Sequence, residues 1–347
     1  MGGSSPTCTA TQEVFPPYLT YSGPEHGQDP RTPWNVTRSG LPLPSAPARL
    51  SADYPPAVRN GQVKANGVEF AYLEDGPDDG PLALCLHGFP DTAHSFRHLL
   101  PALAEAGYHA VAPWLRGYAP TSLAADGVYH QAALGSDACA LHEALGGDGR
   151  AVLVGHDWGA FAAYCAAPYE PQRWRRVVIL SIPPPAAMAQ AFLTYDQMRR
   201  SFYVFLFQLP LGDLALNVDE LRFVERLWED WSPGYDAAWD VERVKESLCD
   251  AERRSAALGY YRSMFATAPP PEQYAPVQAA VAAPPQPTLY LHGQDDGCFG
   301  LPADIAVEPL LSEGSVVRRV ARTGHFLHLE RPDDVNGHIL EFLSAGS

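Results

Sequence analysis

The segment Ala151-Val-Leu-Val-Gly-His-Asp-Trp-Gly-Ala160 decides the fold. A short run of β-branched and aliphatic residues ends at Gly155, and small residues follow from Gly159 in a stretch predicted to be helical. The core reads G-x-D-x-G, which is the nucleophile-elbow pattern with aspartate in place of the usual serine. Such a tight turn brings backbone segments into contact. Glycine is therefore needed two residues before Asp157 and two residues after it. The motif predicts a strand, a sharp turn that carries Asp157, and a helix.

Apolar runs alternate with helical patterns on both sides of this segment. Asn66-Gly67 predicts the turn of a hairpin within residues 63–73. Further strands are predicted at 81–86, 109–112, 177–180, 288–291 and 316–320, and helices at 134–145 and 333–343. This alternation predicts an α/β fold with a mostly parallel central sheet and helices on both faces. Asp157 would then lie at the carboxyl edge of the sheet, where ligands bind in open α/β sheets.

Proline-rich segments divide the chain into four predicted parts. Residues 1–60 are rich in Pro, Gly, Ser and Thr and are expected to form an extended arm. Residues 61–182 would form the first part of the sheet core, and 286–347 the second. Between them, residues 183–285 lack strand patterns and carry apolar side chains at helical spacing, which predicts a helical lid inserted into the core.

Composition excludes several classes of partner. The 347 residues carry a formal net charge of −16, so nucleic acid is not expected as a partner. No apolar run approaches the roughly 18 residues of a membrane span, and no signal peptide is apparent. The six cysteines form no C-x-x-C pair, which predicts free thiols and a cytoplasmic location. The sequence leaves open whether the protein is a monomer or a homodimer.

Two further loops supply partners for Asp157. Asp295 and Asp296 follow the strand at 288–291, and His325 follows the strand at 316–320. The order nucleophile, acid, histidine is that of α/β-hydrolases. We expect Asp296 to orient His325, and Asp295 to face solvent.

An earlier loop, His87-Gly-Phe-Pro90, ends a strand that faces the elbow. The backbone N–H groups of Phe89 and Trp158 could form an oxyanion hole there. We expect the side chain of His87 to brace this loop, and the bond before Pro90 to be a candidate cis peptide.

Together with Gly155-His-Asp-Trp-Gly159 and Gly324-His325, this loop resembles the motifs of α/β-hydrolase-fold epoxide hydrolases, over residue 61 to the end of the chain. The resemblance implies two lid tyrosines. The segment at 201–210 places one at Tyr203, and Tyr260-Tyr-Arg-Ser-Met264 points to Tyr261. The apolar side chains of the lid favour a small apolar or aromatic epoxide as substrate, and we expect Phe89, Trp158 and Phe207 to contact it. Other candidate pocket walls are Phe192, Phe202, Phe205 and Leu209.

The implied reaction has two steps and needs no metal or organic cofactor. In the first, Asp157 attacks an epoxide carbon while Tyr203 and Tyr261 donate hydrogen bonds and a proton to the epoxide oxygen. In the second, His325, held by Asp296, activates water that hydrolyses the ester and releases a vicinal diol.

The sequence leaves two alternatives open. A haloalkane or haloacid dehalogenase would use the same aspartate nucleophile but needs two halide-binding donors. Trp158 could supply one, whereas the side chain of Phe89 has no N–H to supply the second. A non-catalytic ligand-binding homologue could keep the pocket without turnover, because function belongs to the site and not to the fold.

Overall fold

The computed structural model describes residues 58–302 and 304–345. The predicted N-terminal arm lies outside the described residues up to position 57, and the first strand begins at Arg59.

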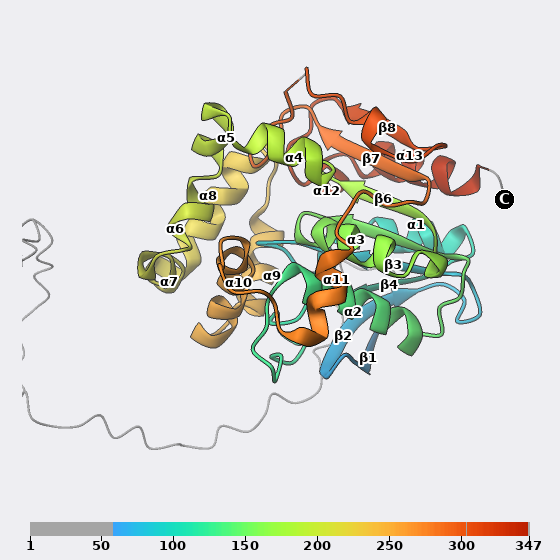
Figure 1. Ribbon diagram of the computed structural model, residues 1–347, viewed down its shortest axis with the longest axis horizontal. Coiled ribbons are helices and arrows are strands. Elements are labelled where there is room, and N and C mark those ends of the chain that lie inside the picture. The colour runs from blue at the N-terminus through green and yellow to red at the C-terminus, as the bar shows by residue number, and fades with distance from the viewer. Residues whose placement is uncertain (1–57, 303, 346–347) are drawn as a thin grey trace, which may run out of the picture. The chain divides into compact units, whose positions relative to one another are not determined.

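Eight strands form one mixed sheet in the order β1-β2-β4-β3-β5-β6-β7-β8 (Figure 1). The β1–β2 and β2–β4 pairs are antiparallel, and every later pair is parallel. The strands are β1 Arg59–Ala65, β2 Val68–Asp75, β3 Leu82–Leu86, β4 His109–Pro113, β5 Ala151–His156, β6 Trp174–Leu180, β7 Thr288–Gly293 and β8 Val316–Val320. The predicted, mostly parallel sheet is therefore confirmed.

Burial of the strands follows their place in the sheet. Every residue of β3, β4, β5 and β7 is buried, as expected for parallel strands covered on both faces. The edge strand β1 is largely exposed. It joins β2 through Asn66 and Gly67, which have φ values of 44° and 74°. Two positive φ values are those of a type I′ turn, so the predicted hairpin is confirmed.

Helices cover both faces of the sheet (Figure 1). α1 (Leu99–Glu105) and α13 (Pro332–Ser344) contact each other on one face. α2 (Gln131–Ala144) and α3 (Trp158–Tyr169) contact each other on the opposite face. The short helix α12 (Leu327–Glu330) precedes α13.

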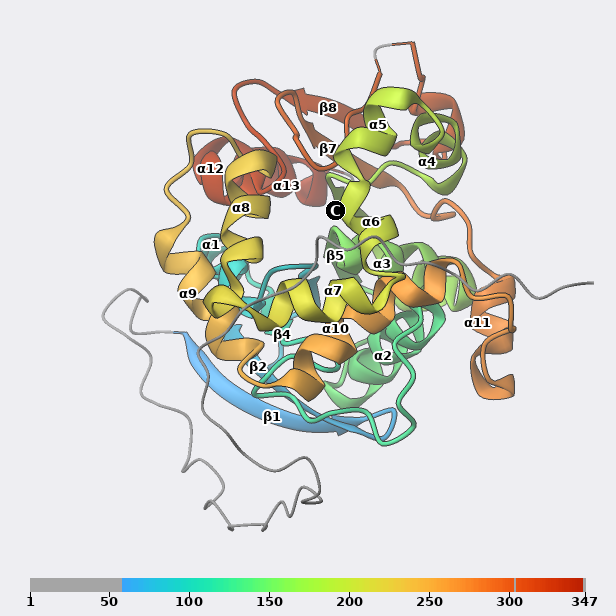
Figure 2. The same cartoon turned by 90° about the vertical axis from the view of Figure 1, so that its left-hand side faces the viewer.

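The described residues between β6 and β7 form helices and connecting turns. The helices are α4 Pro185–Phe192, α5 Tyr195–Arg200, α6 Phe202–Leu206, α7 Pro210–Asn217, α8 Arg222–Trp231, α9 Ala238–Ser247, α10 Ala251–Met264 and α11 Ala275–Ala279. Seen from their side, α6, α7 and α10 cross in front of the end of β5 and the start of α3 (Figure 2).

One of these helices, α11, lies on the core, where Val277 and Tyr274 pack against small residues of α2 and α3. The division of the chain into an arm (1–60), two core parts (61–182 and 286–347) and a lid (183–285) stays a prediction. In the part of the chain that the structure describes, no helix has both the length and the apolar character needed to cross a lipid bilayer.

Candidate active site

Asp157 occupies a sharp turn between β5 and α3, with φ of 49° and ψ of −115°. Such a backbone conformation is strained for a residue with a side chain. The neighbouring glycines are required by close approach. A Cβ on Gly155 would collide with the carbonyl group of Gly159, and a Cβ on Gly159 would collide with the carbonyl group of Leu86 in β3. The elbow geometry expected from the sequence is present.

The two oxygens of the buried Asp157 carboxylate have different surroundings. The backbone N–H of Phe89 donates a hydrogen bond of 2.8 Å to Oδ1. Oδ2 lies 3.6 Å from Nε2 of His325. The backbone N–H of Trp158 opens α3 and, like the other first N–H groups of a helix, has no acceptor within the helix. Its part in an oxyanion hole stays a prediction.

The loop that carries Phe89 is braced by His87, as expected. The ring nitrogen Nδ1 of His87 donates to the carbonyl of Gly88 at 2.9 Å, and Nε2 accepts from the N–H of Leu115 at 3.0 Å. Burial lowers the pKa of His87 to about 4, so the ring is neutral at pH 7. The Phe89–Pro90 peptide bond is cis.

Of the two candidate acids, Asp296 contacts His325 and Asp295 is exposed. Oδ2 of Asp296 lies 3.0 Å from Nδ1 of His325. Its Oδ1 accepts hydrogen bonds from the N–H groups of Cys298 (2.8 Å) and Phe299 (2.9 Å). Burial alone would raise the pKa of Asp296, but His325, followed by His292 and the Phe299 amide, outweighs burial and lowers it.

The charge of His325 follows from its neighbours. Burial by itself lowers the pKa of His325, but the sulfur of Cys298 and the two carboxylates outweigh burial. The pKa consequently lies well above its usual value of about 6.5. Esterification of Asp157 would remove one of these carboxylates and so favour the neutral ring that a general base requires.

The two predicted lid tyrosines meet over this site. Tyr203 lies on α6 and Tyr261 on α10, both are buried, and their ring centroids are 5.6 Å apart. The Tyr203 hydroxyl lies 3.3 Å from the sulfur of Cys298. The Tyr261 hydroxyl has no hydrogen-bond partner of normal geometry among the described residues, and the indole of Trp158 is the nearby polar group that lowers its pKa. Burial first, and the charge of Asp157 with it, raise the pKa of both phenols well above 10.

Aromatic rings surround these phenols. The ring of Tyr261 contacts those of Phe89 at 5.1 Å, Trp158 at 5.2 Å and Phe207 at 5.2 Å, so all three predicted substrate contacts adjoin the site. Three other candidate pocket walls instead face outward, because the exposed fractions of Phe202, Phe205 and Leu209 are 48%, 41% and 54%. The ring of the last candidate, Phe192, is tilted against that of Phe205, with their centroids 6.0 Å apart.

Comparison with known proteins is consistent with this arrangement. The family model for the α/β hydrolase fold matches residues 81–332. Epoxide hydrolase A of Mycobacterium tuberculosis is 30% identical over 319 residues, which span 82% of this chain and 96% of that protein. The chain belongs to the α/β-hydrolase-fold epoxide hydrolases.

Other members of the family agree with this assignment. Epoxide hydrolase 3 of Xenopus tropicalis is 30% identical, over 90% of this chain and 84% of that protein. The crystal structure of epoxide hydrolase A from Mycobacterium thermoresistibile has a TM-score of 0.66 at 27% identity and covers 83% of this chain and 98% of that one. The Bacillus megaterium epoxide hydrolase, solved with an inhibitor, has a TM-score of 0.69 at 27% identity, covering 82% and 99%.

Helix α8 forms hydrogen bonds with the loops that carry the candidate catalytic residues. The sequence motifs did not indicate these contacts. The carbonyl of Trp231 accepts from the N–H of His325 at 2.9 Å and from that of Gly297 at 3.1 Å. The indole of Trp228 donates to the carbonyl of Pro90 at 2.8 Å. One helix end thereby links the loops of the histidine, the acid and Phe89. The helical spacing of apolar residues predicted the helix. It could not predict these hydrogen bonds, because every residue has a backbone carbonyl.

Four further side chains, which the motifs did not indicate, donate hydrogen bonds to backbone carbonyls at His325 and in the segments that carry the two tyrosines. The carbonyl of His325 accepts from Oγ of Ser181 at 2.7 Å and from Nε2 of His156 at 3.0 Å. The side chain of Gln208 donates to the carbonyl of Tyr261 at 2.9 Å, and that of Arg262 donates to the carbonyl of Phe207 at 3.0 Å. These last two bonds join the segments that carry the two tyrosines.

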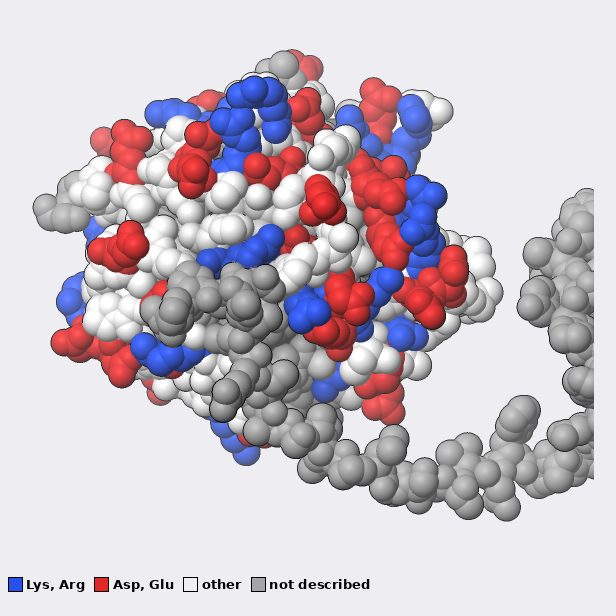
Figure 3. Space-filling view, turned by 180° about the vertical axis from the view of Figure 1, so that it is seen from behind, with Lys and Arg blue, Asp and Glu red and all other residues white. Residues whose placement is uncertain are grey.

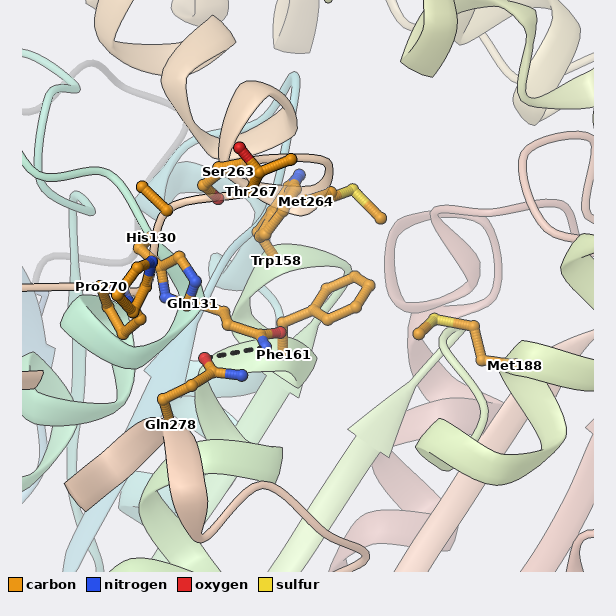
Figure 4. Close-up of a pocket in the computed structure, with 13 residues that line it drawn as sticks. His130, Gln131, Trp158, Phe161, Met188, Ser263, Met264, Thr267, Pro270 and Gln278 are labelled. Carbon is orange, nitrogen blue, oxygen red and sulfur yellow. Dashed lines mark hydrogen bonds between the residues drawn. The ribbon is translucent and has the colours of Figure 1, made fainter. Parts of the chain in front are cut away.

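A pocket of about 500 Å³ adjoins the site on one side of Trp158 (Figure 4). Phe161, Met188 and Met264 contribute apolar walls, and a hydrogen bond of 3.2 Å between Gln131 and Gln278 lies near its floor.

Two buried groups among the described residues have donor atoms close enough to share a cation. Asp91, His156 and His328 form one, and Asp157, Cys298 and His325 form the other. In the first group, Nε2 of His156 donates a hydrogen bond to the carbonyl of His325. This bond gives the His156 ring a structural role, which is to hold the backbone of His325 in place. The expectation that no metal takes part in the reaction stays a prediction.

Proposed function

We propose that this epoxide hydrolase acts through a covalent ester on Asp157. This proposal is supported above all by the different contacts of the two carboxylate oxygens of Asp157. Oδ1 is held by the Phe89 amide, and Oδ2 faces His325 below the two phenols. One oxygen is therefore available to attack carbon while the other becomes the carbonyl oxygen of the ester.

In the first step, Oδ2 of Asp157 attacks an epoxide carbon and the carbon–oxygen bond of the ring breaks. Tyr203 and Tyr261 donate hydrogen bonds to the departing oxygen, and one of them supplies its proton. Their raised pKa keeps both phenols protonated at neutral pH, as this role requires. The absence of a strong protein acceptor for the Tyr261 hydroxyl, among the described residues, leaves it free to bind the substrate.

In the second step, Nε2 of His325 takes a proton from water, and the oxygen of that water attacks the ester carbonyl. Asp296 stabilises the imidazolium that forms. Negative charge develops on Oδ1, where the Phe89 N–H already donates, with the Trp158 N–H as the second proposed donor. When this intermediate collapses, the bond between the carbonyl carbon and the substrate oxygen breaks, and that oxygen takes the proton held by His325 to give the vicinal diol. The Asp157 carboxyl group then loses its proton and the tyrosinate regains one through solvent.

We propose a small apolar or aromatic epoxide as the substrate. Phe89, Trp158 and Phe207 surround the phenols, and the adjoining pocket has further apolar walls. An apolar lining favours a substrate whose polar part is limited to the epoxide oxygen.

Intact-protein mass spectrometry of His325→Gln tests the scheme. Removing the base stops the second step but not the first, so incubation with an aryl epoxide should add the mass of one substrate molecule to the protein. Peptide mapping should place the adduct on Asp157. The double variant Asp157→Asn/His325→Gln is the control and should stay unmodified. Absence of an adduct with every member of a broad epoxide panel would contradict the proposal.

A haloalkane substrate is less well supported, because Phe89 offers no side-chain donor for a halide. Halide release from a haloalkane panel is the measurement that separates the two activities. Turnover of neither panel, together with ligand-induced stabilisation, would favour a binding protein instead.

We infer a cytoplasmic location from the thiols. The five cysteines in the described part of the chain are all free, and four of them are buried. Acidic and basic side chains are interspersed on the face shown in Figure 3, which supports the expectation that nucleic acid is not a partner.

We also infer that any homodimer uses the lid. Exposed large apolar side chains gather there at Leu193, Tyr195, Met198, Phe202, Phe205, Leu209, Leu211, Leu214, Val218, Met264 and Phe265. Analytical ultracentrifugation distinguishes monomer from homodimer.

A further inference from the structure

Cys298 lies inside the site, although neither the sequence motifs nor the proposed reaction uses it. Its sulfur is buried and lies 3.3 Å from the Tyr203 hydroxyl. The sulfur, a carboxylate oxygen of Asp157 and a ring nitrogen of His325 all lie within 4.8 Å of one another. Three different donor atoms thus converge at the reacting carboxylate.

These three donors suit a borderline-soft divalent cation. Zn²⁺ binds thiolate, imidazole and carboxylate tetrahedrally at about 2.0–2.3 Å, which places ligand atoms roughly 3.3–3.8 Å apart. The separation of 3.6 Å between Nε2 of His325 and Oδ2 of Asp157 already falls in that range. Mg²⁺ and Ca²⁺ prefer oxygen ligands and are poorly matched to the sulfur and nitrogen.

The imidazole and the thiol are both held in place. Nδ1 of His325 faces Asp296, whereas buried Nε2 has no hydrogen-bond partner of normal geometry among the described residues. A carboxylate on the far nitrogen is the arrangement that orients metal-binding histidines. The backbone N–H of Cys298 donates to Asp296, and its carbonyl accepts from Gln197 at 2.9 Å. The acid loop therefore sets the position of the sulfur.

We propose that Asp157, Cys298 and His325 form an inhibitory site for Zn²⁺ or Cd²⁺. On binding, the Cys298 thiol releases its proton to solvent, as does His325 where it is protonated, and the cation accepts a lone pair from each side chain. No oxidation or reduction takes place. The cation occupies the electron pairs of the nucleophile and of the base, which blocks both steps. Inhibition rests on the proposed function, whereas binding does not.

The test is a titration of the full chain with Cd²⁺ as the probe, followed by two readouts. Ultraviolet absorption of the cadmium–thiolate bond reports binding, and diol formation reports inhibition. The variants are Cys298→Ser and, in case serine disturbs folding, Cys298→Ala, with thermal unfolding measured for both. Cys249→Ser is the matched control, because Cys249 also has a carboxylate beside its sulfur, from Asp250 at 3.7 Å, but is exposed.

Wild type and Cys249→Ser should bind one Cd²⁺ with thiolate absorption and should be inhibited, while Mg²⁺ has no effect. The Cys298 variants should lose that absorption, and the inhibitory concentration should rise at least about 10-fold, since even changes around metal ligands cost about 10- to 100-fold in affinity. Unchanged absorption and inhibition in folded Cys298 variants would overturn the site, as would absence of the absorption in wild type. If the absorption depends on Cys298 but the protein turns over no epoxide, the metal site is supported and the proposed function is refuted.

Discussion

Asp296 and Tyr261 are both buried in the candidate active site, yet their polar atoms have opposite surroundings. Both oxygens of Asp296 are engaged, one by His325 and the other by two backbone amides. The hydroxyl of Tyr261 is enclosed by aromatic rings and lacks a hydrogen-bond partner of normal geometry in the described part of the chain. The acid is fixed by hydrogen bonds, whereas the phenol is fixed by packing.

This difference fits the role that we propose for each group. A carboxylate that orients a histidine works best when it cannot move, and its buried charge requires partners. A phenol that protonates a substrate must keep its O–H available, because a strong acceptor in the protein would compete with the epoxide oxygen.

The largest effect is expected at the nucleophile. Asp157→Asn keeps the size of the side chain but removes the attacking carboxylate, so diol formation should fall by about 10⁴-fold or more. Asp295→Asn is the control, because that exposed acid has no part in the scheme and turnover should be unchanged. Substantial turnover by Asp157→Asn would show that the carboxylate does not act as the nucleophile.

The phenols should matter for the first step alone. Tyr203→Phe/Tyr261→Phe should slow ester formation by about 10²- to 10⁴-fold, the usual contribution of general acids. Stopped-flow measurement under single-turnover conditions isolates this step.

Tyr260→Phe is the matched control for the phenols. The Tyr260 hydroxyl donates to the carbonyl of Arg116 at 2.6 Å, so its loss should cost about 1 kcal/mol of unfolding free energy and leave ester formation intact. An equal loss of rate in the control and in the double variant would contradict the assigned roles.

The pH dependence should differ between the two steps. Hydrolysis of the ester needs neutral His325, so its rate should fall about 10-fold per unit as the pH drops below the pKa of that ring in the ester. Esterification removes the Asp157 charge, which is one of the causes that raise this pKa in the free enzyme. Ester should therefore accumulate in wild type under acid quench at low pH. Ester formation should not decline up to pH 10, because the pKa of both phenols lies well above that value.

The smallest effect is expected at the His325 carbonyl, because two side chains donate hydrogen bonds to it. Ser181→Ala removes one of two donors to the His325 carbonyl, while His156 keeps the other. A loss of about 0.5–1.5 kcal/mol corresponds to a fall of at most roughly 10-fold in the rate of ester hydrolysis. Ester formation should be unaffected, and Ser312→Ala, in the loop before β8, serves as the control. An effect on both steps would mean that Ser181 supports the whole site and not the histidine alone.

Sequence patterns predicted the order of the candidate catalytic residues along the chain, because each of them lies in a loop that follows a strand. Asp157, Asp296 and His325 come after β5, β7 and β8, and parallel strands bring their carboxyl ends to one edge. The lid was harder to predict. Tyr203 and Phe207 are four residues apart and share the inner side of their segment, whereas Phe202 and Phe205 face outward. Apolar character alone did not distinguish them, because the lid leaves large apolar side chains exposed.

The sequence by itself therefore determined the elbow at Asp157, the sheet and the chain positions of the acid and the base, because local turns and strand ends are encoded by neighbouring residues. Only the tertiary structure decided that the carbonyl of Trp231 links the loops of His325 and Gly297, and that Cys298 lies beside Asp157. These contacts join segments that are remote in the chain. Some of them use backbone atoms, which every residue shares, so no pattern of side chains could have indicated them.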